Sequence, residues 1–360
     1  MDQINDLWLA NGQLITPRGM VDGAMRVAHG RIAAIRARAP RGARRVSVRG
    51  AYVAPGFIDL HVWGDPQAVS REAAKHGTTA FLTSIAPDPL PDLCKRLAAL
   101  RGSGGFEGAQ CLGAHLEGPF VNPRRAGALP KRWMRPPSIT ELHALSSEDN
   151  IRMITFAPEL PGAREAIRWC RRRRIAASLG HSDADASTAL AAVEAGASAV
   201  THVFNAMRPF HHREPTLLSV ALTDPRLMTM VILDGVHVNA YAFRLLLRAK
   251  GAERISLVTD SIRHHGWDVT KRHGAYYTRQ GILAGSGLTM IRAVRNATAS
   301  GGASLDEAVR MATESPARLL GLERGRGTLA IGQRADVTVF DRRFRVRLTI
   351  VRGHAVYQAG

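Results

Sequence analysis

The chain has 360 residues, of which 45% are apolar, so it can bury one large core or two ordinary ones. No run of about 18 uncharged apolar residues occurs, and the first residues lack a signal-peptide pattern, so we predict no membrane association. The formal net charge is +19, but it comes from scattered arginines without a nucleic-acid-reading motif. We therefore expect a solvated basic surface and no nucleic-acid partner.

The cysteines point to a reducing compartment. Cys94, Cys111 and Cys170 are few, odd in number and far from any C-x-x-C spacing. This pattern disfavours a disulfide framework and a thiolate metal site, and it predicts a cytoplasmic protein.

Both ends of the chain have the character of short strands separated by glycines. Residues 7–10, 25–28, 31–35 and 45–48 alternate with Gly-containing turns, and 327–332, 336–340 and 347–353 do the same near the other end. Each end is too short to form a core alone. The pattern favours one β-sandwich domain, built from 1–53 and 327–360, over separate edge hairpins.

The middle of the chain, 54–326, alternates strand and helix patterns. The candidate strands are 56–61, 78–85, 111–117, 151–157, 175–181, 199–204, 228–234 and 255–260, with amphipathic segments between them. Eight such units predict a (β/α)₈ TIM barrel, so the fold class is α/β. An open doubly wound sheet is the alternative, but the first strand lacks the Gly-rich phosphate fingerprint that usually accompanies that fold.

Four polar residues stand at the ends of these candidate strands: Glu117, His181, His202 and Asp260. Barrel active sites are built at the carboxyl ends of the strands, so the four side chains are expected to meet there. Two imidazoles and a carboxylate can hold a divalent ion and leave a position open for water. The alternatives are hydrogen-bonded core histidines and, for Asp260, a helix N-cap.

A set of short motifs, in order along nearly the whole chain, resembles the N-acetylglucosamine-6-phosphate deacetylases of the amidohydrolase superfamily. That family combines a metal-dependent barrel with a β-sandwich. Each motif is weak alone, and the joint pattern is specific. The motifs are Ala54-Pro-Gly-Phe-Ile-Asp, His115-Leu-Glu-Gly-Pro-Phe, Leu179-Gly-His-Ser, Thr201-His-Val-Phe-Asn-Ala-Met, Arg213-Glu-Pro, Asp234-Gly-Val-His-Val, Val258-Thr-Asp and Leu283-Ala-Gly-Ser.

The resemblance implies the chemistry and the metal ligands. Glu117, His181 and His202 would bind one divalent ion, zinc first, with Fe²⁺, Mn²⁺ or Co²⁺ as alternatives. Asp260 would act as general base and then general acid. The implied reaction removes the N-acetyl group of an amino sugar, N-acetylglucosamine-6-phosphate first, to give glucosamine-6-phosphate and acetate. The alternatives are another N-acyl amino sugar or conjugate, and a non-catalytic sugar-phosphate binder.

The first strand departs from a pattern found in many amidohydrolases. A His-x-His pair there holds a second metal ion, whereas this chain has His61-Val-Trp63. Because indole cannot bind a metal, the departure predicts a single ion. His61 is then either a polar group beside it or a weak ligand of a second site.

The resemblance also implies substrate contacts. Arg213 would bind the phosphate, often across a dimer interface, because a guanidinium suits bidentate phosphate binding. Its alternative is a surface arginine. Asn205, Ala206 and His237 would contact the sugar. These assignments imply a small-molecule amino-sugar substrate and a homodimer.

A second departure falls on the substrate side. The family usually has a carbonyl-polarising histidine where this chain has Leu129. Loss of one such donor typically costs on the order of 10²–10³ in rate. Either the substrate differs or another histidine substitutes, and the neighbours available in the sequence are His115, His211, His212 and His264. The segment 263–280 is also short beside the family's substrate-covering region.

Overall fold

A ring of parallel strands forms the centre of the computed structural model, which describes residues 6–101, 107–264 and 267–360. Successive strands pair in parallel from the first to the last. The predicted barrel is confirmed. Its strands are β6 (Phe57–Gly64), β7 (Thr78–Ile85), β8 (Gln110–Leu116), β9 (Ile151–Phe156), β10 (Ala176–Leu179), β11 (Ala199–Val200), β12 (Met228–Val231) and β13 (Ile255–Leu257).

The ring closes through the segment that follows β12. β13 pairs with β12, and a few residues later β14 (Ser261–His264) pairs with β6. Between the two, the Asp260 amide donates to the carbonyl of His61 at 2.8 Å. A small antiparallel extension continues from β14 on this side of the barrel, formed by β15 (Val269–Arg272), β16 (Ala275–Thr278) and β17 (Leu283–Ser286).

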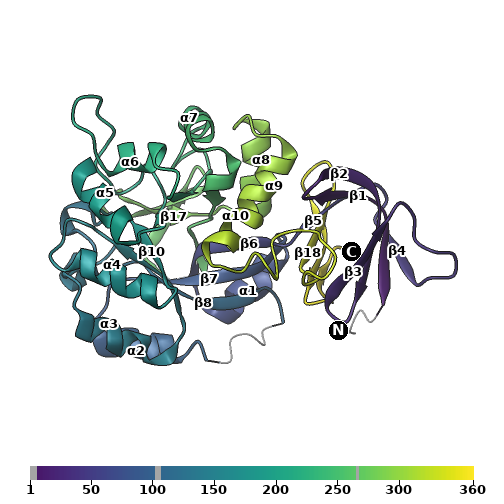
Figure 1. Ribbon diagram of the computed structural model, residues 1–360, viewed down its shortest axis with the longest axis horizontal. Helices are drawn as coiled ribbons and strands as arrows, with labels where there is room; N and C mark the ends of the chain where they lie inside the picture. The colour runs from purple at the N-terminus through teal and green to yellow at the C-terminus, as the bar shows by residue number, and fades with distance from the viewer. Residues whose placement is uncertain (1–5, 102–106, 265–266) are drawn as a thin grey trace.

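Helices connect the barrel strands and cover the outside of the ring (Figure 1). In α4, Ala163, Ala166, Ile167 and Cys170 are buried at helical spacing, while the arginines between them face solvent. The helices are α1 (Pro66–Ala74), α2 (Leu90–Ala98), α3 (Ile139–Leu145), α4 (Ala163–Arg172), α5 (Ala186–Ala195), α6 (Leu217–Thr223), α7 (Ala240–Lys250), α8 (Met290–Ala299), α9 (Leu305–Ala312) and α10 (Glu314–Leu319), with 3₁₀ turns η2 (Pro123–Arg125), η3 (Lys131–Trp133), η4 (Ser146–Glu148) and η5 (Ala252–Arg254).

A second sheet contains strands from both ends of the chain, which lie together at one side of the barrel (Figure 1). It has its own apolar core, which includes Leu9, Met25 and Ile350. The prediction of a small β-domain from both termini is confirmed, whereas its division at 1–53 and 327–360 stays a prediction. The strands are β1 (Leu7–Thr16), β2 (Gly19–Ala28), β3 (Arg31–Arg36), β4 (Arg45–Ser47), β5 (Tyr52–Pro55), β18 (Val337–Phe340), β19 (Val346–Val351) and β20 (His354–Gln358).

One predicted strand is wrong. Residues 327–332 form turns and irregular backbone, because Gly327 and Gly332 both adopt positive φ (100° and 90°) and interrupt any extended run. In the described part of the chain, no helix has the length and apolar character needed to cross a membrane.

Buried polar contacts join the second sheet to the barrel. The hydroxyl of Thr338 donates to the carbonyl of Gly77 at 2.6 Å, and that of Thr349 donates to the carbonyl of Ala74 at 2.8 Å. Phe57 and Phe340 pack beside them with ring centroids 6.2 Å apart. The two layers therefore share a packed, hydrogen-bonded interface.

Candidate active site

The four polar residues predicted at strand ends lie at the carboxyl end of the barrel. Glu117 follows β8 directly, and His181 and His202 each lie two residues beyond β10 and β11. Asp260 lies between β13 and β14. All four are at most 8% exposed. Because parallel strands end at the same edge, the barrel brings together side chains that are far apart in the sequence.

Three potential ligand atoms converge on one point. Oε1 of Glu117 lies 2.9 Å from Nε2 of His181 and 2.7 Å from Nε2 of His202, and the two Nε2 atoms are 3.2 Å apart. Tetrahedral zinc ligands at their usual bond lengths are separated by about 3.3–3.5 Å. Three electron-pair donors so close together repel one another unless a cation or proton lies among them. The arrangement therefore fits a divalent ion with small adjustments.

The hydrogen bonds behind His181 support a ligand role. Its Nδ1 lies 2.7 Å from the carbonyl oxygen of Arg125, which can only accept, so Nδ1 carries a proton and Nε2 is the nitrogen left to bind a metal. Nδ1 of His202 is buried and has no hydrogen-bond partner among the described residues. His181 is therefore fixed in the tautomer that binds a metal.

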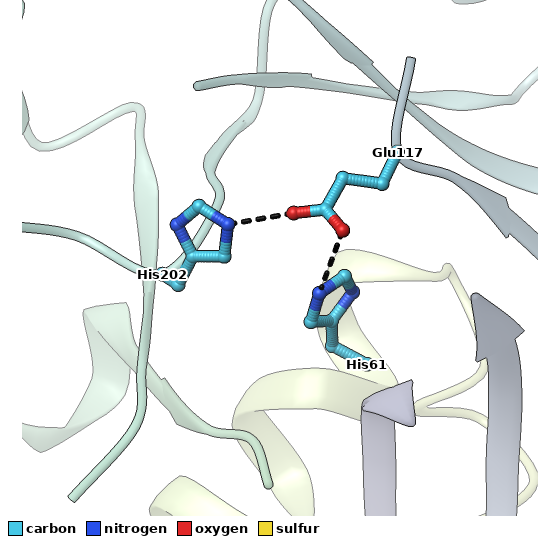
Figure 2. A group of neighbouring side chains, drawn as sticks. All are labelled: His61, Glu117 and His202. Carbon is cyan, nitrogen blue, oxygen red and sulfur yellow. Dashed lines mark hydrogen bonds and ion pairs between the residues drawn. The ribbon is translucent and has the colours of Figure 1, made fainter. Parts of the chain in front are cut away.

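A second, overlapping group contains His61, Glu117 and His202, whose potential ligand atoms lie within 4.8 Å of one another (Figure 2). His202 approaches one carboxylate oxygen of Glu117, and Nε2 of His61 lies 3.4 Å from the other. The same His61 atom is 3.2 Å from Oδ1 of Asp260. Glu117 thus lies between the His181–His202 pair and His61.

Burial and charge act in opposite directions on these groups. Burial raises the pKa of Glu117, but the charge of His61 and contacts with His181 and His202 outweigh it and hold that pKa well below its usual value. Burial lowers the pKa of His202. An ionised carboxylate and a neutral imidazole are the forms that bind a cation. Burial also lowers the pKa of His61, but Glu117 and Asp260 together raise it to about 10. A protonated imidazole has no lone pair for a metal.

Asp260 is held by the residue that breaks the His-x-His pattern. The indole Nε1 of Trp63 donates to Oδ1 of Asp260 at 2.7 Å. Because Asp260 precedes strand β14 and no helix begins there, the N-cap alternative is wrong. The carboxylate instead lines the same cavity as the three potential ligand residues, where it can exchange a proton with water or substrate.

The backbone is unusual at these positions. His181, His202 and Asp260 have φ of 48°, 29° and 50°, in the left-handed region that residues with a Cβ seldom adopt. Phe204 and Ala206 share it, at 78° and 51°. Such conformations cost of order 1–3 kcal/mol each and concentrate at functional sites. The surrounding barrel holds these residues in positions that serve the site at the expense of local stability.

A cavity of about 230 Å³ opens over the converging side chains. It brings together all the sequence-predicted site residues except His61 and Arg213. His61 lies against Glu117 and Asp260, and Arg213 lies on an exposed loop, where its Nη1 is 3.0 Å from Nε2 of His212. The lining residues are Trp63, Glu117, Gly127, Ala128, Leu129, His181, His202, Asn205, Ala206, Ile232, His237, Asp260, Trp267, Ile282, Leu283, Ala284 and Gly285.

His237 and Asn205 occupy the loops that follow β12 and β11. Nδ1 of His237 lies 2.7 Å from Oδ2 of Asp234, which fixes the orientation of the ring. The side-chain amide of Asn205 contacts the carbonyls of His202 and Val203, both at 3.3 Å. Both side chains are thus positioned at the cavity before any ligand enters.

Leu129 lines the cavity, and His115, His211 and His212, three of the histidines considered as substitutes for the missing donor, are not among its described lining residues. His115 is fully buried, with its ring nitrogens 3.1 Å from the carbonyl of Leu60 and 2.8 Å from the hydroxyl of Thr155. His211 and His212 are also absent from the described lining. The side chain of His264 lies outside the described residues. The described cavity wall therefore carries an alkyl group where the family carries a donor.

Sequence reasoning missed a half-buried acid and part of the cavity wall. Glu159 accepts hydrogen bonds from the amide of Asp183 at 2.6 Å and from the hydroxyl of Ser182 at 2.8 Å, and so holds the turn that carries His181. The sequence feature that could have identified Glu159 is its position just beyond the candidate strand 151–157. Trp267 also lines the cavity, and nothing in the local sequence pattern pointed to it.

A model of the amidohydrolase family matches residues 52–356. The chain therefore belongs to the amidohydrolase family, whose members are metal-dependent hydrolases.

The more specific resemblance is to deacetylases of amino-sugar phosphates. The chain is 35% identical to N-acetylglucosamine-6-phosphate deacetylase of Bacillus subtilis, over 84% of each chain. It is 34% identical to N-acetylgalactosamine-6-phosphate deacetylase of Escherichia coli O157:H7, over 95% of this chain and 97% of the other. Among solved structures, a mutant N-acetyl-D-glucosamine-6-phosphate deacetylase from Mycobacterium smegmatis in complex with N-acetyl-D-glucosamine-6-phosphate matches with a TM-score of 0.89 and 31% identity, covering 98% and 100% of the two chains.

Proposed function

We propose that this protein removes the N-acetyl group of N-acetylglucosamine-6-phosphate, giving glucosamine-6-phosphate and acetate. The observation that carries the proposal is the convergence of Glu117, His181 and His202 beside Asp260 in one cavity. The relatives with this activity match the chain over most of its length.

In this proposal Glu117, His181 and His202 hold one divalent ion. A carboxylate and two imidazoles suit zinc best, and Fe²⁺, Mn²⁺ and Co²⁺ accept the same donors. A bound ion of this kind acidifies a water molecule and polarises an amide carbonyl. His61, whose Nε2 lies 3.4 Å from Glu117 and 3.2 Å from Asp260, is a polar group beside the ion in this proposal rather than a ligand.

Asp260 carries the proton in this proposal. Its carboxylate accepts a proton from the attacking water and delivers it to the leaving nitrogen, so that the product departs as an amine. Trp63 occupies one carboxylate oxygen and fixes the orientation of the group during the transfer. Burial of the site keeps bulk water from competing for the proton.

Asn205, Ala206 and His237 are proposed to bind the sugar, and Arg213 its phosphate. Among the described residues that line the cavity, none is an arginine or lysine. Arg213 is exposed and is not among the described lining residues of the cavity, which supports a homodimer in which each subunit lends this arginine to the other. A cytoplasmic location is part of the proposal, and the three free cysteines are consistent with it.

A second candidate substrate is N-acetylgalactosamine-6-phosphate. It is favoured by the 34% identity to a deacetylase of that sugar, which is nearly as high as the identity to the glucosamine enzymes. The two sugars differ only at the C4 hydroxyl, far from the amide that is broken. The chemistry assigned to Asp260 and the three ligand residues is the same for both.

Acetate release by the purified, metal-loaded protein tests the proposal. We expect turnover of N-acetylglucosamine-6-phosphate, little turnover of unphosphorylated N-acetylglucosamine, and loss of turnover in D260N with metal content unchanged. The galactosamine epimer, run in parallel, identifies the preferred sugar. Ligand-induced thermal stabilisation without acetate release from any of the sugars would contradict the proposal and support a non-catalytic sugar-phosphate binder.

A further inference from the structure

One wall of the cavity is apolar and well packed. Trp63 and Leu129 are 2% and 7% exposed and belong to one cluster, against which Trp267 packs. The rings of Trp63 and Trp267 are 5.1 Å apart. Ile282, which is 43% exposed, also lines this side of the cavity. These residues come from β6, from the loop between η2 and η3, and from the segments around β15 to β17, so the wall is assembled from distant parts of the chain.

The apolar wall adjoins the group that handles the proton. Trp63 donates its indole hydrogen to Asp260 at 2.7 Å, and Leu129 and Trp267 pack in the same cluster as Trp63. An amide that reacts beside Asp260 has an acyl substituent on one side of its carbonyl carbon and a polar sugar on the other. The sugar suits the polar lining of Asn205 and His237, whereas the acyl substituent suits the apolar wall.

We propose that this wall is an acyl pocket with Leu129 as its specificity-determining residue, so that the protein removes N-propionyl and N-butyryl groups as well as N-acetyl. The proposal rests on the proposed function, since it concerns the same hydrolysis in the same cavity. A histidine at position 129 would place polar nitrogen atoms against tryptophan rings and disfavour a longer alkyl chain there. Leucine carries no such penalty and adds contact area.

The expected gain per methylene is modest. Transfer of one methylene group from water to a fully apolar site favours binding by up to about fourfold. The acyl pocket therefore predicts a kcat/KM for the N-propionyl substrate between the N-acetyl value and about four times that value. A pocket shaped only for acetyl would instead reject the longer chain sterically.

The test compares N-acetyl-, N-propionyl- and N-butyryl-glucosamine-6-phosphate with the metal-loaded protein. Release of glucosamine-6-phosphate is measured, because this product is the same for all three substrates. The variant L129H is expected to lower the propionyl-to-acetyl ratio of kcat/KM at least tenfold. The matched control L129M keeps the volume and apolar character of the side chain, so it should keep the wild-type ratio.

The outcomes separate this inference from the function on which it rests. A propionyl value below the acetyl value in the wild-type protein overturns the acyl pocket and leaves deacetylation intact. An unchanged ratio in L129H also overturns the role of Leu129. Release from none of the three substrates overturns the proposed function, and this inference with it. The acyl pocket is established if the propionyl kcat/KM is at or above the acetyl value in the wild-type protein and falls below the acetyl value in L129H.

Discussion

Trp63 shows how a residue that cannot bind a metal can still serve a metal site. Its indole N–H is bound to Asp260, and Nε2 of His61 is 3.2 Å from the same oxygen atom. A second metal ion beside His61 would attract the carboxylate of Asp260 as one of its ligands. The indole N–H of Trp63 instead holds this oxygen of Asp260 without competing for a metal ligand.

Replacing Trp63 by phenylalanine should slow the reaction without emptying the site. W63F keeps an aromatic ring in the wall but loses one hydrogen bond to a charged group, which is worth about 1.5–3 kcal/mol. We therefore expect kcat to fall roughly 10- to 100-fold, with the metal content unchanged. Metal analysis and steady-state kinetics check this. W133F, at a residue that does not line the cavity, is the control and should leave kcat within twofold.

The two overlapping ligand groups predict different metal stoichiometries for two histidine variants. If Glu117, His181 and His202 form the site, H181N should lose most of its bound ion, because only two ligands remain, whereas H61N should keep about one ion per chain. Elemental analysis of dialysed protein measures both. The reverse pattern, with the ion lost in H61N and kept in H181N, would assign the site to the group drawn in Figure 2.

The ligand-type residues were predictable from sequence, and their partners were not. Glu117 and His181 end apolar runs, so strand periodicity alone places them at the rim of the barrel. The hydrogen bond from Trp63 to Asp260 joins positions 197 residues apart. No local pattern encodes such a contact, because it depends on which strands become neighbours when the ring closes.

At the scale of elements, the end of α7 is fastened to the end of α6. The ammonium group of Lys250, in the last turn of α7, donates to the carbonyl of Asp224, which follows α6, at 2.5 Å. Burial lowers the pKa of Lys250 to about 8, against the attraction of Asp224. The folded protein therefore binds this proton less tightly than the unfolded chain does.

This shift predicts a pH dependence of stability. Between about pH 8 and the ordinary lysine pKa of about 10.5, the unfolded chain carries more protons than the folded one, so stability from this group rises with pH. K250M removes the group. The difference in unfolding free energy between wild type and K250M, from urea titrations at pH 7.5 and 9.5, should shift in favour of the wild type at the higher pH. A difference that is equal at both values would contradict the assignment.

Long amphipathic helices were predictable, and short or wholly buried ones were not. α4 and α7 have clear apolar faces. α6 is buried on nearly all sides, so its sequence has no alternation of polar and apolar residues at helical spacing. Its buried residues are Leu217, Leu218, Val220, Ala221 and Leu222. The extension from β15 to β17 has little alternation of buried and exposed residues. Tertiary packing decides the structure of such segments.

At the scale of the whole molecule, the barrel and the second sheet should unfold together. Thr338 and Thr349 donate buried hydrogen bonds to Gly77 and Ala74 across their interface. We expect one calorimetric transition. T349V removes the hydroxyl that donates to the carbonyl of Ala74, while the amide of Gly77 still donates to that carbonyl at 3.1 Å. The loss should cost about 0.5–1.5 kcal/mol and lower the temperature of the entire transition.

The control for T349V is T223V, at an exposed helical hydroxyl that bonds to Ser219 within α6. It should change the transition temperature by less than T349V does. If T349V instead produced two separated transitions, or left the single transition unmoved, the interface would not couple the two layers.

The closing segment, 255–264, also sets an order of events during synthesis. Glu117, His181 and His202 are all made before Asp260, which follows His202 by about 60 residues, or some 3 to 12 s of translation at ~5–20 residues per second. Until that segment emerges from the ribosome, β6 and β12 have no strand to join them. During synthesis, the three residues proposed to bind the ion are therefore present before Asp260, the residue proposed to transfer the proton.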